Sequence, residues 1–255
     1  MRLATHSDLD AIVAVAIAAL PADPVNPYRF PRWQEYPADY AKFTRIRYAG
    51  WLADPANVIM VCEVPGSDTS LNPGQQTMES RYPSPTAAGD KRIVAFGIWE
   101  LPPPQRTSNG ADQQGLATLL PHSTATPPST SSDTADTITT RRDANPARVA
   151  RYAAEFSRAK SHFFELPYGD TNLYLSILAC HPDYQRRGIG RRLVTWGLEK
   201  ASREGLDLTV FGSPMGSLLY QAVGFREVGR FRVQVDGEEE SLETLAMVLK
   251  NEDIP

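Results

Sequence analysis

A short turn in the second half of the chain combines two glycines with several arginines. Residues 185–190 read QRRGIG, and Arg191 and Arg192 follow directly. Glycine adopts left-handed backbone angles without strain, so successive N–H groups of such a turn can converge on one anion. The arginines add positive charge at the same place. These residue types and their spacing predict a site for an anionic cofactor.

The residues on either side of the turn predict the elements that position it. Residues 173–180 are mostly apolar and predict a β-strand, which His181-Pro182 ends because proline donates no ladder hydrogen bond. Apolar residues at helical spacing predict a helix over 190–204, and Gly205 fits its C-terminal end. The partial positive charge at the N-terminus of that helix favours the same anion.

Other interpretations of the turn fit less well. A dinucleotide-binding G-x-G-x-x-G turn needs glycine at position 193, where Leu193 stands, and a P-loop needs Gly-Lys-Ser/Thr, which is missing from the turn. An ordinary α/β crossover without a ligand is the remaining alternative, because short motifs also occur by chance.

The turn resembles the signature of the GNAT superfamily of acetyl-CoA-dependent N-acetyltransferases, Gln/Arg-x-x-Gly-x-Gly/Ala after a strand. Gln185, Gly188 and Gly190 match it. The resemblance continues through a strand at 207–211 and a helix at 215–225, whose LYQAVGF resembles the family's Tyr-x-x-x-Gly-Phe element. Two motifs at family spacing are more specific than one.

The resemblance implies acetyl-CoA as cofactor and assigns residues to it. Main-chain groups of three strand residues would bind the pantetheine arm and the acetyl carbonyl, namely Leu178, Ala179 and Cys180. Backbone amides of the turn would bind the pyrophosphate, namely those of Gln185, Arg186, Arg187, Gly188, Ile189, Gly190 and Arg191.

The resemblance also suggests a general acid. Tyr220 holds the tyrosine position of the second motif, and a phenol stays protonated near neutral pH, so it could protonate the leaving thiolate. The alternative role is a packed aromatic side chain. Ser213 and Gly216 depart from the asparagine and alanine that many members carry, which leaves the contacts of this helix to the pantetheine arm open.

The general base and the acceptor site are less marked. Glu100 ends the apolar run 93–99 and is the predicted base, with Glu165, Asp170, His181 or a water chain as alternatives. The aromatic-rich segment 26–54 lies where the resembling family covers its acceptor pocket. We therefore expect Tyr28, Trp33 and Glu35 to contact the acceptor, although such aromatic density also fits a core.

Composition excludes several classes of protein. The net charge of −4 argues against a nucleic-acid partner, and apolar runs stay shorter than the roughly 18 residues that span a bilayer, so no membrane association is expected. Two cysteines and four scattered histidines predict neither a disulfide framework nor a metal site. Residues 11–20 indicate an amphipathic helix capped by Ser7 or Asp8 rather than a signal peptide, so cytoplasmic location is expected.

The predicted fold is a single α/β (α+β) domain spanning residues 1–255, with a mixed, mostly antiparallel central sheet flanked by helices. Flexible insertions are expected at 65–91 and 104–140, where composition is rich in Pro, Gly, Ser and Thr. The expected reaction is acetyl transfer from acetyl-CoA to a primary amine, with a small-molecule acceptor favoured. The alternatives are a noncatalytic acyl-CoA-binding or regulatory module, and an acyltransferase for another acyl-CoA or a peptide or protein amine. Oligomeric state is not readable.

Overall fold

The computed structural model describes residues 1–65, 91–103 and 141–254. These residues build a seven-stranded sheet in the order β1-β2-β3-β4-β5-β7-β6, in which only the β4–β5 pair is parallel. The predicted mixed, mostly antiparallel sheet is confirmed. The strands are β1 (Arg2–Leu3), β2 (Asn57–Pro65), β3 (Lys91–Glu100), β4 (Asn172–Cys180), β5 (Asp207–Gly212), β6 (Arg226–Gln234) and β7 (Ser241–Leu249).

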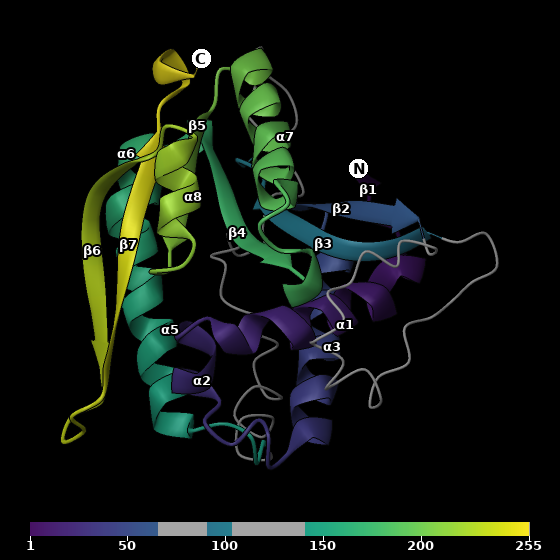
Figure 1. Ribbon diagram of the computed structural model, residues 1–255. Helices are drawn as coiled ribbons and strands as arrows, with labels where there is room; N and C mark the ends of the chain where they lie inside the picture. The colour runs from purple at the N-terminus through teal and green to yellow at the C-terminus, as the bar shows by residue number, and fades with distance from the viewer. Residues whose placement is uncertain (66–90, 104–140, 255) are drawn as a thin grey trace, which may run out of the picture.

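Helices cover both faces of this sheet (Figure 1). The longer ones are α1 (Leu9–Ala19), α3 (Pro37–Ala53), α5 (Pro146–Lys160) and α7 (Ile189–Glu204), and the shorter ones are α2 (Val25–Arg29), α6 (Leu166–Tyr168) and α8 (Ser217–Ala222). Single turns complete the set: η1 (His6–Asp8), η2 (Leu20–Ala22), η3 (Ser161–Glu165), η4 (Gly169–Thr171), η5 (Pro182–Tyr184) and η6 (Asn251–Asp253).

Separate apolar clusters assign each helix to a face. Side chains of α7 and α8, among them Val194 and Tyr220, pack with Leu173 and Leu208 on one face. On the other face, α1 and α3 pack on β2 and β3, and α5 packs on the β6–β7 end. The sheet is therefore the middle layer between two layers of helices.

The predicted strand–turn–helix unit is present with nearly the expected bounds. β4 ends at Cys180, α7 begins at Ile189, and Gly205 follows α7 in the left-handed conformation. The helix predicted over 215–225 is shorter, because α8 covers only Ser217–Ala222. Pro214 precedes it, and the chain leaves the helical path at Val223 before Gly224, whose φ is +106°.

The start of the chain differs from the prediction in its helix cap. Asp8 stands at the N-terminus of α1, but its carboxylate turns back and accepts hydrogen bonds from the Thr5 N–H (2.7 Å) and the Arg2 guanidinium (2.7 and 2.8 Å). Thr5 and Asp8 thereby form a capping box around η1. Neither Ser7 nor Asp8 caps α1 with its side chain, because the carboxylate is already used.

The two predicted insertions lie outside the described residues, except for the end residues Pro65 and Lys91. These two belong to β2 and β3 and pair with each other. Within the described ranges, no helix is both long and apolar enough to cross a membrane.

Candidate active site

The sheet opens between β4 and β5, which pair only over Asn172–Leu175 and Asp207–Val210. β4 continues to Cys180 along β3, and on its other side no strand of the described residues pairs with this part. We call this opening, between residues 176–180 of β4 and the end of β5, the β4–β5 split. Alternate N–H and C=O groups of β4 face the split, because only half of them point toward β3.

An irregularity in the sheet coincides with the start of the split. Trp99 pairs with Leu175 and Ile98 pairs with Ile177, so Ser176 is an extra residue in β4. Such a bulge bends a strand and increases its twist. It therefore directs the second half of β4 away from β5, and with it the predicted cofactor residues Leu178, Ala179 and Cys180.

The glycine-containing turn follows β4 and forms a cradle for an anion. Gly188, with φ +77°, precedes α7, and Arg186 also has a positive φ, of 61°. The Gln185 side chain donates to the Cys180 carbonyl at 3.0 Å and ties the turn to the strand end. The first α-helical hydrogen bond of α7 runs from Arg192 to the Gly188 carbonyl, at 3.1 Å. The N–H groups of Ile189, Gly190 and Arg191, in the first turn of the helix, come before this bond and have no acceptor within the helix. The Gln185 N–H donates to the Pro182 carbonyl at 3.2 Å.

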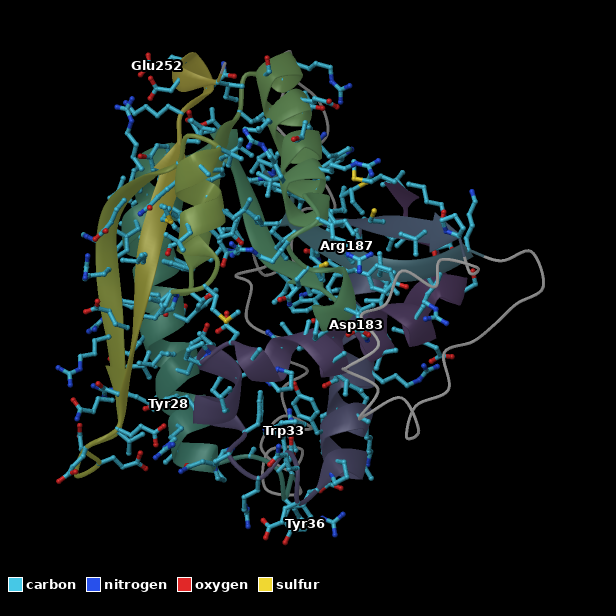
Figure 2. All side chains as sticks on the ribbon, viewed as in Figure 1. Tyr28, Trp33, Tyr36, Asp183, Arg187 and Glu252 are labelled. Atoms are coloured by element: carbon cyan, nitrogen blue, oxygen red, sulfur yellow. The ribbon has the colours of Figure 1, made fainter. Side chains whose placement is uncertain are left out.

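The cations at the cradle are accessible. The side chains of Arg186, Arg187, Arg191 and Arg192 are all exposed. Figure 2 shows Arg187 beside the C-terminal end of β4, where its guanidinium lies 5.1 Å from the centroid of the Tyr184 ring. Helix terminus, backbone amides and arginines therefore favour a phosphate group at one place.

Tyr220 lies on α8 at the other side of the split, and two glycines make room for its ring. A Cβ atom on Gly216 would lie 3.1 Å from the ring and one on Gly212 would lie 3.4 Å from it. Glycine at 216, a departure from the family pattern, therefore fits this tyrosine. Burial raises the pKa of Tyr220 above its usual value, and the charge of Asp23 raises it further, so the phenol keeps its proton.

Tyr174 of β4 packs on the other face of the sheet from Tyr220. It lies in the cluster of Phe164 and Ala246, whereas Tyr220 packs with Leu173 and Leu175. Burial raises the pKa of Tyr174 well above its usual value, and the charges of Tyr152 and Glu100 raise it further. Glu100 pairs with Tyr174 across β3 and β4.

Glu100 is the predicted base, and Lys160 of α5 holds it. The Lys160 ammonium lies 2.8 Å from both carboxylate oxygens, and Lys160 is almost completely buried. Burial raises the pKa of Glu100, while the charge of Lys160 opposes that rise. Glu165 belongs to the same cluster, 3.8 Å from the Lys160 ammonium.

Two other candidate bases, Asp170 and His181, lie outside the cluster of Glu100, Lys160 and Glu165. Asp170 is exposed in η4, before the start of β4. His181 begins η5, where its Nδ1 accepts a hydrogen bond from the Asp183 N–H at 3.4 Å. Burial raises the pKa of the neighbouring Cys180 thiol to about 11, which makes it a weak nucleophile.

The predicted acceptor residues lie away from the split. Tyr28 is buried against Ala159 of α5 and Phe231 of β6. Trp33 packs on Tyr40 at a ring distance of 5.9 Å, and Glu35 is exposed in the turn before α3. Figure 2 shows Tyr28 and Trp33 at the lower end of the molecule, far from Arg187.

The sequence analysis did not predict Asp23, whose charge acts on Tyr220. Asp23 sits in the turn between η2 and α2, where it also accepts a hydrogen bond from the Val25 N–H at 3.0 Å. No spacing signal marks it, because it is far from Tyr220 in the sequence. Among the described side chains, no group of three or more His, Cys, Asp or Glu residues is placed to hold a metal ion.

A protein family and a curated protein resemble this chain. The family model described as "Acetyltransferase (GNAT) domain" matches residues 153–227, which include the cradle and Tyr220. A protein of Stachybotrys chartarum named "Acetyltransferase" is 21% identical over 250 residues, covering 98% of this chain and 90% of its own length.

Two solved structures of acetyltransferases also resemble this chain. One is described as histone acetyltransferase HPA2 and related acetyltransferase from Corynebacterium glutamicum, with 17% identity, a TM-score of 0.49, and coverage of 97% of this chain and 93% of its own. Another, an acetyltransferase of the GNAT family from Desulfovibrio desulfuricans, has 11% identity, a TM-score of 0.46, and coverage of 98% and 97%. The match to the family model includes the turn, the β4–β5 split and Tyr220, so residues 153–227 are similar to an acetyltransferase domain of the GNAT type.

Proposed function

We propose that the protein transfers the acetyl group of acetyl-CoA to a primary amine by direct attack in a ternary complex. The observation that carries this proposal is the β4–β5 split, which has an anion cradle at one end and a protonated Tyr220 at its side. When bound, acetyl-CoA supplies the acetyl thioester. The chain supplies the positioning and the proton transfers.

The residues divide these tasks between them. The pyrophosphate binds at the cradle formed by residues 185–191, to the N–H groups at the start of α7. The open edge of Leu178, Ala179 and Cys180 binds the pantetheine arm and the acetyl carbonyl. A fixed N–H at that edge stabilises negative charge on the carbonyl oxygen without reorganisation. As the amine nitrogen bonds to the carbonyl carbon and the carbon–sulfur bond breaks, Tyr220 protonates the sulfur.

Glu100 is the base in this proposal. It accepts the proton that the amine loses, and its raised pKa brings the carboxylate closer to the basicity of a useful general base. Lys160 then holds the carboxylate in place at 2.8 Å. Asp23 is the second candidate, since its charge acts on Tyr220.

The acceptor is proposed to be a small molecule. The net charge of −4 and the aromatic-rich segment 26–54 favour a small acceptor over a peptide or protein amine. The two cysteines are unpaired thiols, which agrees with the proposed cytoplasmic location. A noncatalytic acyl-CoA-binding module remains the rival, since it needs the cradle but not Tyr220.

Calorimetric titration of acetyl-CoA into the purified protein tests the proposal first. Gly188→Glu puts a carboxylate into the cradle and should abolish binding. Gly205→Glu is the matched control, because Gly205 ends the same helix, has a φ of +67° and also has open space where a Cβ would lie. Equal loss in both variants, or no binding by the native protein, would contradict the cradle.

A further inference from the structure

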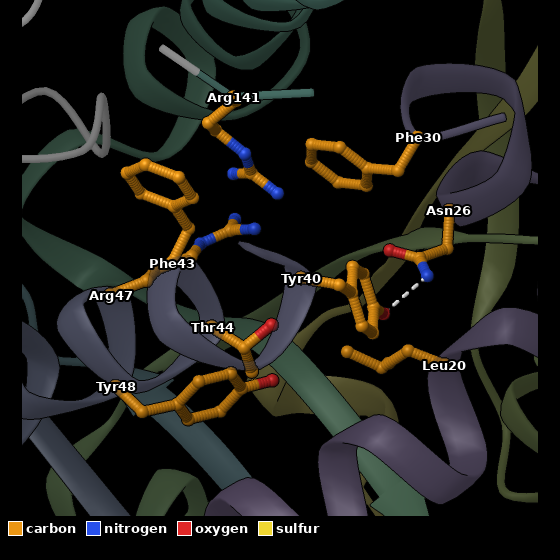
Figure 3. A pocket seen from close by; sticks show the side chains of 9 residues that line it. All are labelled: Leu20, Asn26, Phe30, Tyr40, Phe43, Thr44, Arg47, Tyr48 and Arg141. Atoms are coloured by element: carbon orange, nitrogen blue, oxygen red, sulfur yellow. Dashed lines mark hydrogen bonds between the residues drawn. The ribbon is translucent and has the colours of Figure 1, made fainter. Parts of the chain in front are cut away.

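A small cavity lies at the inner side of α3. It has a volume of about 20 Å³, and Phe30, Phe43, Thr44, Arg47, Tyr48 and Arg141 are among the residues that line it. That volume holds a single small polar group, because a water molecule needs roughly 10–15 Å³. Figure 3 shows the guanidinium groups of Arg47 and Arg141 directed into the same space.

Arg141 is fixed in this cavity and its charge is compensated. Its guanidinium lies 4.2 Å from the ring centroid of Phe30 and 4.7 Å from that of Phe43. Two of its nitrogens donate to the completely buried carboxylate of Asp143, at 3.0 and 2.6 Å. This pair is neutral as a whole, but the side of the guanidinium that faces the cavity still has N–H donors.

Arg47 brings a charge that no described carboxylate balances. Its guanidinium rests on the Trp51 ring at 4.5 Å, and the ion pairs of the described residues do not include it. A third arginine lies close by. The pKa of Arg29 is lowered to about 10, mainly by burial and in smaller part by the charges of Arg47 and Arg141. Three arginines and one carboxylate leave the cavity with excess positive charge.

A donor without a partner lies at the same cavity. The Tyr48 hydroxyl is buried and makes no hydrogen bond to any described residue. Burial raises the pKa of Tyr48 well above its usual value, so the phenol stays a donor. A buried polar group without a partner costs stability, and an anion would accept its hydrogen bond.

The cavity and the split are close to each other. The Tyr48 ring contacts Phe96 of β3 at a centroid distance of 5.4 Å, and Phe96 pairs with Ala179 on β4. The side chain of Phe96 therefore separates the wall of the cavity from β4, the strand that forms one side of the split.

We propose that Arg47, Arg141 and Tyr48 bind a carboxylate of the acceptor, so that the acceptor is an amine that also carries a carboxylate. This inference rests on the proposed function. A carboxylate matches the planar donor fork of a guanidinium and the small size of the cavity. The amine end of the same molecule would then lie at the β4–β5 split.

Paired substrates test this inference. A series of straight-chain ω-amino acids of increasing length is compared with the corresponding ω-amino amides, which differ only in charge, by measuring kcat/KM for acetylation. The native protein should prefer one or more amino acids over their amides. Arg47→Gln should lower kcat/KM for those amino acids about 10- to 100-fold, the usual effect of losing a charged hydrogen bond. It should leave kcat/KM for the amides and the affinity for acetyl-CoA unchanged.

Arg45→Gln is the matched control, because Arg45 lies on the same helix but pairs at the surface with Asp10. Equal use of amino acids and amides, or an unchanged preference in Arg47→Gln, would overturn the inference. Calorimetry with glutarate, a dicarboxylate without an amine, separates the two proposals. If no amine is acetylated, the proposed function fails. Even then, glutarate binding by the native protein that is lost in Arg47→Gln supports the carboxylate site. Native protein that does not bind glutarate contradicts that site.

Discussion

The position of Tyr220 depends on two residues that have no side chain. Gly212 and Gly216 leave the space that its ring occupies, and burial keeps the phenol protonated. Tyr220→Phe keeps the ring and removes only the proton donor. We expect kcat to fall by roughly 10²- to 10⁴-fold, the range of general acid catalysis, with the Kd for acetyl-CoA unchanged. Steady-state kinetics and calorimetry on the same preparations measure both values.

Two results would contradict this role. Turnover that survives in Tyr220→Phe would leave Tyr220 as a packed aromatic residue. A native protein that binds acetyl-CoA but acetylates no amine would instead support the noncatalytic module. Phe225→Leu is a suitable control, because Phe225 packs on the Tyr220 ring at 5.7 Å and has no proton to donate.

Asp8 gives a prediction on pH and stability. Hydrogen bonds from Arg2 lower the pKa of Asp8 from 3.8 to about 2, with a smaller contribution from Thr5. The pKa of this carboxyl is lower in the folded protein than in the unfolded protein. Its stabilisation of the folded state is therefore complete at pH values above the pKa in the unfolded protein. It is lost as the pH falls through the pKa in the folded protein. Asp8→Asn should therefore cost about 2 kcal/mol at neutral pH, and the cost should vanish between about pH 4 and pH 2.

Urea unfolding of both proteins across this pH range measures that difference. Asp10→Asn is the control, because the Asp10–Arg45 pair is exposed at the surface and such pairs contribute about 0–1 kcal/mol. A cost for Asp8→Asn that stays constant down to pH 2 would show that the carboxylate's charge is not its source.

At the scale of elements, α7 lies unusually close to β3. A Cβ atom on Gly197 would lie 2.2 Å from the ring of Trp99, which is completely buried. Gly197→Ala should therefore destabilise the fold by about 1–3 kcal/mol through overpacking, even though alanine favours a helix by up to about 1 kcal/mol. Since the same helix begins at the cradle, acetyl-CoA should also bind several-fold more weakly. Unfolding and calorimetric titrations measure both effects.

Ser202→Ala, on the exposed face of α7, is the control for helix propensity. If Gly197→Ala proves as stable as the native protein, Trp99 has enough freedom to move, and the close packing does not position the cradle.

The sequence predicts the helices and strands better than it predicts the tertiary contacts between them. The strand, turn and helix around the cradle are marked by proline and glycine, which act locally, so their bounds could be predicted. The end of α8 at Ala222 and the turning of the Asp8 carboxylate toward Arg2 depend on tertiary contacts. Tyr28, Trp33 and Glu35 were chosen for their place in the chain, but α2 and the turn after it carry them away from the split.

At the scale of the whole molecule, the sheet consists of two parts joined at the β4–β5 pair. Four residue pairs form this seam, and beyond it the strands separate to make the site. The buried Thr209 hydroxyl donates to the Asn172 side-chain oxygen across the seam, at 2.5 Å. The same short seam that allows the split must therefore hold the two parts together.

Thr209→Val tests the contribution of this hydrogen bond. It keeps the shape of the side chain but leaves the buried Asn172 oxygen without its donor, which should cost about 1–3 kcal/mol and increase amide hydrogen exchange in β4 and β5. The chain offers a matched control in Thr244, whose hydroxyl is buried without a hydrogen-bond partner among the described residues. Thr244→Val removes an unsatisfied group, so it should leave stability unchanged or raise it. Equal effects of both substitutions would mean that burial of the side chains, and not the hydrogen bond across the seam, joins the two parts of the sheet.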